Sequence, residues 1–157
     1  MNKNIELTSE EIAYIAGFLD GDGCLLAQLI RRKDYCYGFQ VRLSIYFYQK
    51  TNRYWFLLWL KKKLQYGTLR KRKNGVSEYC IVGSAQVEKI LSLFYNKLRI
   101  KHKLCKLLLT IIEDLKNVQT AQDFVQVAKK VDQVAYFTDS KKRKITASVV
   151  ENFLNSP

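Results

Sequence analysis

The stretch FQVRLSIYFY, residues 39–48, alternates apolar and polar side chains along its whole length. Its apolar positions are Phe39, Val41, Leu43, Ile45 and Phe47. Its polar positions are Gln40, Arg42, Ser44, Tyr46 and Tyr48. Because successive side chains of a strand point to opposite faces of a sheet, this pattern predicts a long strand with one buried and one polar face. Helices must then cover the apolar face.

The flanking sequence supplies those helices and further strands. Thr8 precedes acidic residues and apolar residues at helical spacing, which predicts a capped helix over about residues 9–21. A strand over 24–30 follows, and Asn74-Gly75 predicts a tight hairpin turn. The remaining expected strands cover 68–73 and 76–82, and the remaining helices cover 51–64, 85–98, 103–115, 121–136 and 146–154. The fold class is therefore α+β: an αββαββα core with one four-stranded antiparallel sheet, helices packed on one face, and additional C-terminal helices.

Charge narrows the class of partner. The chain has 157 residues, with 27 Lys and Arg against 14 Asp and Glu, which gives a net charge of +13. This excess favours nucleic acid, an acidic membrane or an acidic protein as partner. No linker or repeat divides residues 1–157, so we expect a single domain. No long apolar stretch or secretion signal is present, so we expect an intracellular protein that makes no use of a membrane.

The polar strand faces favour DNA among these partners. Arginine can bind guanine, glutamine can bind adenine, and apolar groups can meet thymine methyls. A strand of about eight residues spans ~26 Å, or roughly eight base pairs, so one chain could read one half-site. For a single strand or basic run, a solvated surface remains the alternative. The expected DNA contacts are Leu26, Gln28, Ile30, Arg32, Tyr35, Gln40, Arg42, Ser44, Tyr46, Lys50, Arg70, Arg72, Glu78, Ser140, Lys141 and Lys144.

Two carboxylates interrupt the basic character, at Asp20 and Asp22 in the run Asp-Gly-Asp-Gly. A carboxylate near DNA phosphates is repelled unless a cation lies between them, and Mg²⁺ accepts carboxylate, water and phosphate oxygens as ligands. An EF-hand is excluded, because Arg31 occupies the position where that loop needs an acid. The alternative is a helix end followed by a tight turn into a strand.

The run IAGFLDGDG, residues 15–23, resembles the signature of the LAGLIDADG homing endonucleases. The wider pattern resembles the single-motif, homodimeric branch of algal chloroplast intron enzymes, over about residues 10–150. The further landmarks are QKTNRYWF at 49–56, RKR at 70–72, RIKHK at 99–103, VDQ at 131–133 and DSKKRK at 139–144.

The resemblance implies a homodimer with a saddle-shaped sheet over DNA. Two motif helices would pack on a two-fold axis, with Ala16 and Gly17 at the interface and Asp20 in capping or interface hydrogen bonds. The target would be double-stranded DNA of roughly 20 base pairs, nearly palindromic because the dimer is two-fold symmetric. The activity implied is a staggered double-strand break by metal-dependent phosphodiester hydrolysis, which promotes intron mobility. The source implied is an organellar, chloroplast-encoded intron.

The resemblance also assigns the catalytic residues. Asp22 should bind Mg²⁺, with Mn²⁺ as an alternative metal, and the Gly21 carbonyl should lie beside it. Gln49 and Lys101 correspond to residues that order the water network and assist hydrolysis, and Arg53 corresponds to a basic residue near the cleavage site. Simpler roles are open for two of them, since Gln49 could cap the next helix and Lys101 could hold a phosphate. An intron maturase or a catalytically inert nucleic-acid-binding protein on the same scaffold is the alternative function.

Overall fold

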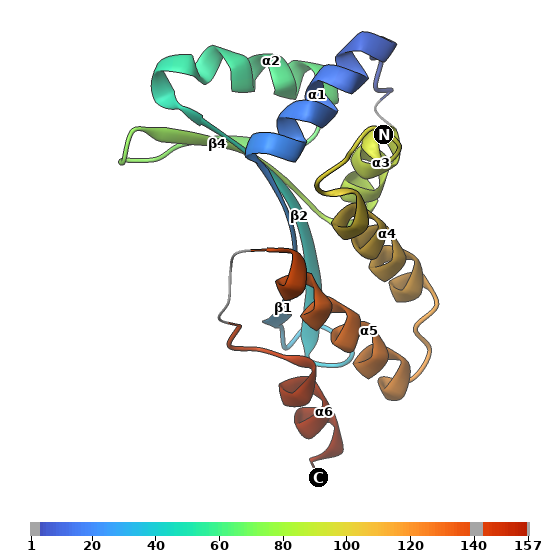
Figure 1. The fold of residues 1–157 in the computed structure, drawn as a ribbon. Coiled ribbons are helices and arrows are strands. Elements are labelled where there is room, and N and C mark those ends of the chain that lie inside the picture. The colour runs from blue at the N-terminus through green and yellow to red at the C-terminus, as the bar shows by residue number, and fades with distance from the viewer. Residues whose placement is uncertain (1–3, 139–142, 157) are drawn as a thin grey trace. The chain divides into compact units, whose positions relative to one another are not determined.

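The computed structural model describes residues 4–138 and 143–156 (Figure 1). The strands are β1 Gly23–Arg31, β2 Phe39–Lys50, β3 Thr68–Lys71 and β4 Val76–Val82. The helices are α1 Ser9–Asp22, α2 Tyr54–Leu64, α3 Ser84–Phe94, α4 His102–Lys116, α5 Ala121–Gln133 and α6 Ala147–Asn155, with 3₁₀ turns η1 Thr51–Arg53 and η2 Val134–Phe137. The strands form one sheet in the order β1-β2-β4-β3. The α+β class and the αββαββα order are confirmed.

The chain divides into two compact units. Unit 1 contains Met1–Leu25 and Ser44–His102, and unit 2 contains Leu26–Leu43 and Lys103–Pro157. Every residue expected to act in catalysis or metal binding belongs to unit 1, so the geometry of that site is described within one unit.

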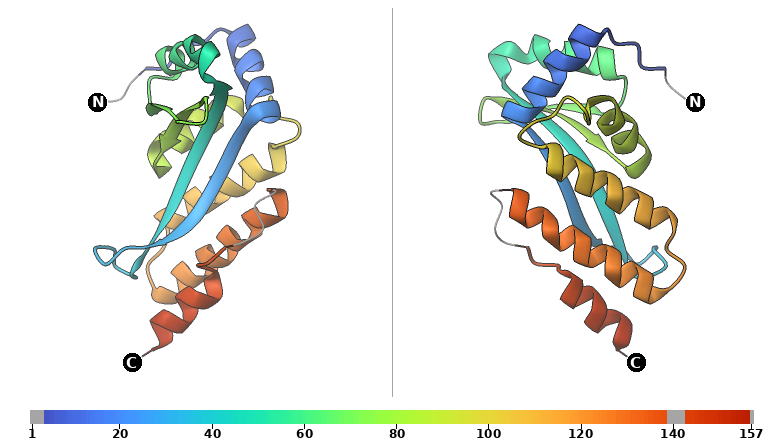
Figure 2. Two further views of the ribbon diagram at one scale, coloured as in Figure 1. Left: turned by 90° about the vertical axis from the view of Figure 1, so that its left-hand side faces the viewer. Right: turned by 45° about the vertical axis from the view of Figure 1, so that its right-hand side comes forward.

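In unit 1, β2 pairs with β4 and β4 pairs with β3, both antiparallel. The alternation read in the sequence is present, because Ile45, Phe47, Tyr79 and Ile81 are fully buried. Phe47 stacks on Tyr79 at 5.8 Å between ring centroids. Helices α2 and α3 contact β4, and α1 packs on α3 (Figure 2). The opposite sheet face is left for polar side chains.

In unit 2, α5 packs against α6 (Figure 2). Aromatic contacts connect both helices to the chain at the start of β2. Tyr37 stacks on Phe124 of α5 at 5.3 Å, and Phe39 meets Phe153 of α6 edge-on at 5.3 Å. The Arg31 guanidinium lies over the Phe39 ring. No helix in the described part of the chain is long and apolar enough to cross a membrane.

Several helix ends differ from the sequence-based boundaries, among them the C-terminal ends of α1, α3 and α5. Helix α1 continues through the motif to Asp22, with its start fixed by a capping box between Thr8 and Glu11. Helix α3 ends at Phe94 instead of continuing to Leu98, because the following backbone turns and donates its N–H groups to Asp20. Helix α5 ends at Gln133 and continues as the 3₁₀ turn η2.

Candidate active site and DNA-facing surface

Asp20 is almost fully buried, at 8% exposure, and is an acceptor for three backbone donors. Its Oδ2 accepts from the N–H groups of Arg99 at 2.7 Å and Ile100 at 3.1 Å, and its Oδ1 accepts from Lys101 N–H at 2.8 Å. Burial on its own would raise the pKa of Asp20, but these N–H donors outweigh burial and the pKa is lowered. Asp20 therefore holds the segment after α3 against the end of α1.

The same contact places Lys101 at the motif. Its Nζ donates to the backbone carbonyl of Asp20 at 2.6 Å, in the last turn of α1. A cation at a helix C-terminus is favoured by the helix dipole and by the unpaired carbonyls there. Burial is the main reason that the pKa of the nearby Cys24 thiol is raised. The positive charge of Lys101 acts in the opposite direction and lowers that pKa. Lys101 is thus fixed beside the exposed end of the motif.

Asp22 contrasts with Asp20. It is the last residue of α1, its side chain is exposed, and it makes no hydrogen bond or ion pair with the described residues. Gly21 beside it is also exposed, and a Cβ built there would meet no atom within 4 Å. A free carboxylate next to an uncovered backbone offers the oxygen ligands that Mg²⁺ prefers.

The described residues contain no group of three or more acidic, histidine or cysteine side chains that could hold a metal by themselves. This arrangement fits Mg²⁺, which commonly uses one or two carboxylates and fills its other positions with water and phosphate oxygens. One chain would then supply Asp22 and the Gly21 carbonyl, and the remaining ligands would come from outside it.

Gln49 and Arg53 form a second polar group, where β2 leads through η1 into α2. Arg53 Nε donates to Gln49 Oε1 at 2.7 Å, and Lys50 N–H donates to the same oxygen at 3.3 Å. Neither η1 nor α2 has a side-chain cap, so Gln49 does not cap the helix. Because its oxygen is occupied, the amide NH₂ of Gln49 is the part available to an external acceptor.

The expected interface residues have different surroundings in the chain. Gly17 is exposed, and a Cβ built there would meet no atom within 4 Å. Ala16 is fully buried inside the chain, and the Asp20 carboxylate is engaged as described. The exposed surface of α1 around Gly17 is therefore the part of the motif helix that a second helix could approach closely, and we correct the expectation for Ala16.

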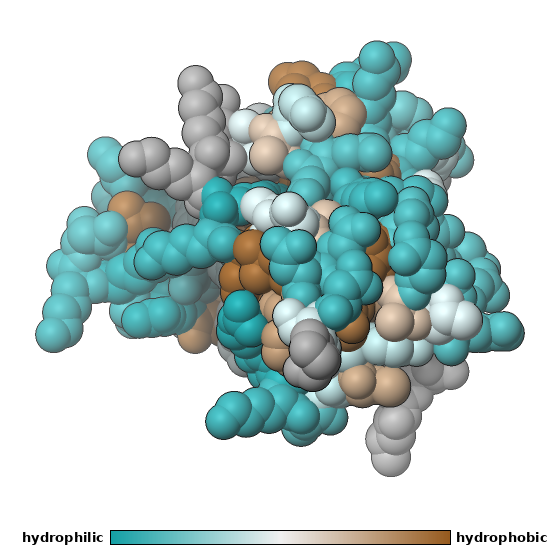
Figure 3. Space-filling model, turned by 90° about the horizontal axis from the view of Figure 1, so that it is seen from below, coloured by the Kyte–Doolittle hydropathy of each residue, from teal (hydrophilic) through white to brown (hydrophobic). Residues whose placement is uncertain are grey.

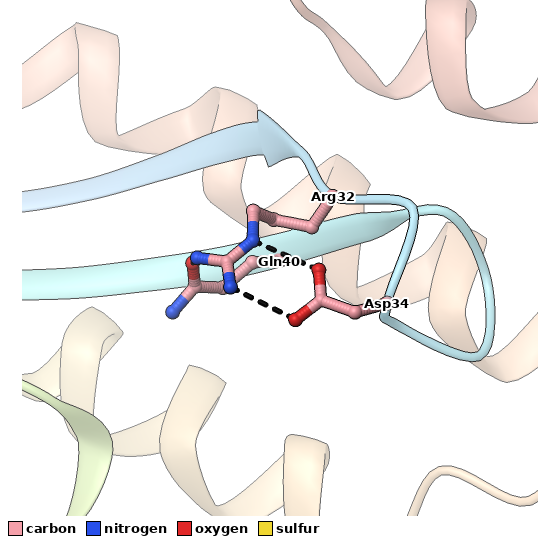
Figure 4. A network of polar contacts seen from close by, with 3 residues as sticks. All are labelled: Arg32, Asp34 and Gln40. Atoms are coloured by element: carbon pink, nitrogen blue, oxygen red, sulfur yellow. Dashed lines mark hydrogen bonds and ion pairs between the residues drawn. The ribbon is translucent and has the colours of Figure 1, made fainter.

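In unit 2, the expected DNA contacts include a polar network around Arg32 (Figure 4). Arg32 donates to both carboxylate oxygens of Asp34, from Nε at 3.0 Å and from Nη2 at 2.9 Å, and its Nη1 lies 3.4 Å from Gln40 Oε1. Hydrogen bonding to Arg32 is the main reason that the pKa of Asp34 is lowered. Arg32 also lies over the Tyr35 ring.

The face of the molecule seen in Figure 3 is largely hydrophilic, with apolar side chains in separate patches.

In unit 1, the polar sheet face is a row of aromatic and charged side chains. Tyr46 and Tyr48 stack with their rings almost parallel, 5.9 Å between centroids. Burial raises the pKa of Tyr48 to about 12, so its hydroxyl stays neutral. Arg72 lies over the Tyr48 ring and forms an ion pair with Glu78 at 2.6 Å.

Two of the expected DNA contacts are covered by the chain itself. Ser44 is fully buried, and its hydroxyl has no hydrogen-bond partner among the described residues. Glu78 is 5% exposed. Both lie on the polar side of the alternation, but both are buried, so we remove Ser44 and Glu78 from the set of direct contacts. Ser140 and Lys141 lie outside the described residues, while Lys144 is exposed.

The other expected contacts are exposed or half-buried, namely Leu26, Gln28, Ile30, Arg42, Lys50 and Arg70. Sequence reasoning did not assign Asp34 or Tyr48 to the site. The alternation put Tyr48 on the polar face with Tyr46, which was the signal for it. Asp34 had no such signal, because its role depends on a turn that brings it to Arg32.

Comparison with known proteins gives the family. The profile of the LAGLIDADG endonuclease family matches residues 15–112. The DNA endonuclease I-CvuI of Chlorella vulgaris is 40% identical over 144 residues, covering 92% of this chain and 89% of the relative. The DNA endonuclease I-CreI of Chlamydomonas reinhardtii is 36% identical over 154 residues, covering 98% and 94%. The chain belongs to the LAGLIDADG endonuclease family.

Solved structures agree with this assignment. I-CvuI bound to the I-CreI target in the presence of 2 mM Mg, with the DNA not cleaved, superposes with a TM-score of 0.87 at 39% identity, over 92% of both chains. The same enzyme bound to its own target in 2 mM Ca gives the same score. The intron-encoded homing endonuclease I-CeuI, at 17% identity and a TM-score of 0.80, shares the fold.

Proposed function

We propose that this protein is a homing endonuclease that makes a staggered double-strand break in one long, nearly palindromic DNA target. The two relatives at 36–40% identity are named DNA endonucleases, and one of them has been solved on DNA with a divalent cation. The observation that carries the proposal is the contrast inside the motif. The Asp20 carboxylate accepts structural hydrogen bonds, whereas Asp22 is exposed and has no hydrogen-bond or ion-pair partner among the described residues.

The active form is a homodimer in which the two units of each chain act as one endonuclease domain. One chain carries one motif, and a double-strand break needs two hydrolysed phosphodiesters. The exposed surface of α1 around Gly17 supports close packing of two motif helices, because Gly17 has no side chain and the space at its Cβ position is open. A two-fold dimer then presents two equal reading surfaces to two half-sites, which explains a nearly palindromic target of roughly 20 base pairs.

Asp22 and the Gly21 carbonyl hold the divalent cation, Mg²⁺ or Mn²⁺. When bound, the cation polarises the phosphate and lowers the pKa of a bound water. The chain's own groups do the rest. Lys101, fixed by the Asp20 carbonyl, places a positive charge near the developing phosphate charge. Gln49, fixed by Arg53, directs its NH₂ donors to the water or phosphate oxygens.

The polar sheet face and the basic residues around it bind the DNA. Side chains on the strands read base edges, and lysines such as Lys50 and Lys144 contact phosphates. The enzyme is encoded in an organellar, chloroplast group I intron and promotes that intron's mobility, as the algal source of the two relatives suggests.

Cleavage selection from a randomised DNA library tests the activity and the target together. The purified protein is incubated with the library in Mg²⁺, and fragments with paired ends are sequenced. We expect enrichment of one nearly palindromic site with a fixed stagger. Specific binding without any cleavage in Mg²⁺ or Mn²⁺ would favour the inert DNA-binding alternative, and no enrichment at all would contradict the proposal.

A further inference from the structure

We propose that unit 2 carries a second nucleic-acid site: the pocket between the β1–β2 loop and α6 holds one nucleotide of a single strand, with its base stacked on the Phe153 ring and its phosphate bound by Arg31 and Lys33. This inference goes beyond the proposed function and does not depend on it. The pocket has a volume of about 560 Å³, which lies within the range usual for sites that hold a small organic ligand.

The pocket involves the side of β1 that faces the helices. The expected DNA contacts on β1 have even residue numbers, so strand alternation points Arg31 to the other face of the sheet. The Arg31 guanidinium lies 5.2 Å from the centroid of the buried Phe39 ring and 5.8 Å from that of Phe153 on α6. Arg31 therefore belongs to a surface separate from the row of expected base contacts on this strand.

Aromatic rings line the pocket and are held in place by the core of unit 2. The Phe153 ring meets Phe39 edge-on at 5.3 Å between centroids, yet it remains 48% exposed. Tyr37 also lines the pocket, and its ring is held by stacking on Phe124. Bases of single strands stack on aromatic side chains and on arginine guanidinium groups. These rings therefore offer a stacking surface that accepts any base.

The charge of the pocket suits a phosphate. Arg31, Arg32 and Lys33 line it, and its described lining residues include no acid. Asp34 of the same loop pairs with Arg32 (Figure 4), whereas Arg31 and Lys33 form no ion pair with the described residues. Two positive charges are thus available to an anionic group, and hydrogen bonds between such cations and phosphate are strong.

The chain forms this pocket before a ligand binds. The Gly38 N–H donates to the Tyr35 carbonyl at 2.9 Å, and the Gly38 carbonyl accepts from the Arg32 N–H at 2.9 Å, so the loop is closed by its own backbone. Gly38 has φ of +80°, and a Cβ built there would lie 2.7 Å from the Phe153 ring. Glycine therefore lets the loop and α6 approach closely. A site held in shape before binding loses less entropy when the ligand arrives.

Other anionic ligands use only part of this surface. An acidic peptide would neutralise Arg31 and Lys33 but leave the exposed Phe153 ring uncovered. A long acyl chain would cover the rings but would bring one anionic group at most to a lining with three cations. A nucleotide in a single strand uses both kinds of group, because it has a flat base and phosphates on either side of it.

The test separates base stacking from general attraction to a chain of net charge +13. Two labelled probes of four nucleotides are compared by fluorescence anisotropy, one with bases and one abasic with the same phosphates, each in RNA and DNA form. We expect wild type to bind the probe with bases roughly tenfold more tightly in at least one form, and the tighter form identifies the source of the strand. Equal affinity for the probes with and without bases would show that charge alone attracts the strand, and would overturn the proposal.

Variants locate the binding. Phe153→Leu keeps an apolar side chain but removes the ring, so it should reduce the advantage of the probe with bases to about threefold or less, and Phe153→Tyr should retain it. Arg31→Gln should weaken both probes alike and lower the salt dependence of binding by about one phosphate contact. Arg31 is exposed, so this variant keeps the test informative even if Phe153→Leu fails to fold. Unchanged probe binding in Arg31→Gln and Phe153→Leu would place the strand elsewhere and overturn the proposal.

Matched controls remove similar groups elsewhere in unit 2. Tyr136→Leu removes a ring that is 87% exposed on η2, and Lys129→Gln removes an exposed cation on α5. Both controls should keep the advantage of the probe with bases. A loss of that advantage in Tyr136→Leu equal to the loss in Phe153→Leu would contradict the assignment to this pocket.

Cleavage of the selected duplex target distinguishes the pocket from the DNA-reading face. Arg31→Gln and Phe153→Leu should cleave the target like wild type while binding the probes more weakly or less selectively. A parallel loss of cleavage and probe binding would make the pocket part of the duplex-binding surface and overturn the inference. Probe binding needs no duplex target, so the test remains valid if the proposed function fails.

Discussion

Asp20 and Asp22 lie two positions apart in the same helix, yet their surroundings give them different tasks. Asp20 is buried and accepts three backbone hydrogen bonds from a segment about 80 residues further along the chain. Asp22 is exposed and makes no such contact within the described residues. The one-letter motif does not distinguish the two carboxylates, and their environments do.

Asp20→Asn should destabilise the protein. Replacing the carboxylate with an amide removes the charge and one of the two acceptor oxygens for the N–H groups of Arg99, Ile100 and Lys101. Charge-assisted hydrogen bonds contribute about 1.5–3 kcal/mol each when a partner is lost, so we expect a loss of roughly 1–3 kcal/mol in the free energy of unfolding. Urea denaturation measures it, and Asp22→Asn is the matched control, which should unfold like wild type.

At the residue scale, the family resemblance predicts roles for Asp22, which lies in the motif, and for Gln49 and Lys101, which lie in later landmarks. It could not reveal that Lys101 is held by the Asp20 carbonyl, because that contact joins positions 81 residues apart. Nor could it show that Arg53 orders Gln49, since this depends on the 3₁₀ turn between β2 and α2. Sequence patterns therefore predicted which side chains could act, whereas their hydrogen-bond partners depend on contacts between residues that the fold brings together.

At the scale of elements, strand alternation and capping signals predicted most boundaries. The capping box of α1 coincides with the signal at Thr8, and the turn with the signal at Asn74-Gly75, where Gly75 has φ of +80°. The capping box of α5 was not predicted. The early end of α3 was missed, because apolar spacing continues to Leu98. Leu98 is buried without being helical, since the chain must turn there to reach Asp20.

The α5 capping box gives a pH prediction. Backbone N–H donors from Gln119 and Thr120 lower the pKa of Asp123 in the folded chain. A lowered folded pKa means that the stabilising contribution is fully present above the ordinary carboxyl pKa and is lost as pH falls through the folded value. The difference in unfolding free energy between wild type and Asp123→Asn should therefore be larger at pH 7 than at pH 3. A difference independent of pH would contradict this role for the carboxylate.

At the scale of the whole molecule, each chain carries one motif with one exposed Asp22, so a double-strand break calls for two chains. We expect Gly17→Arg to weaken dimerisation by on the order of a hundredfold or more, because it places two like charges in a close helix contact. The single chain should fold normally, since this position is open on the chain's own surface. Sedimentation velocity measures the association, and circular dichroism checks the fold. A variant that stays dimeric would rule out this surface of α1 as the interface.

The central claim is that Asp22 serves the metal-dependent reaction while Asp20 serves the structure. The most direct measurement is double-strand cleavage of the selected target in Mg²⁺ by wild type and Asp22→Asn, with DNA binding measured in parallel in Ca²⁺. Asp22→Asn should bind the target and unfold like wild type but lose cleavage by at least about a thousandfold, because the charged metal ligand is gone. Undiminished cleavage by Asp22→Asn would contradict the account.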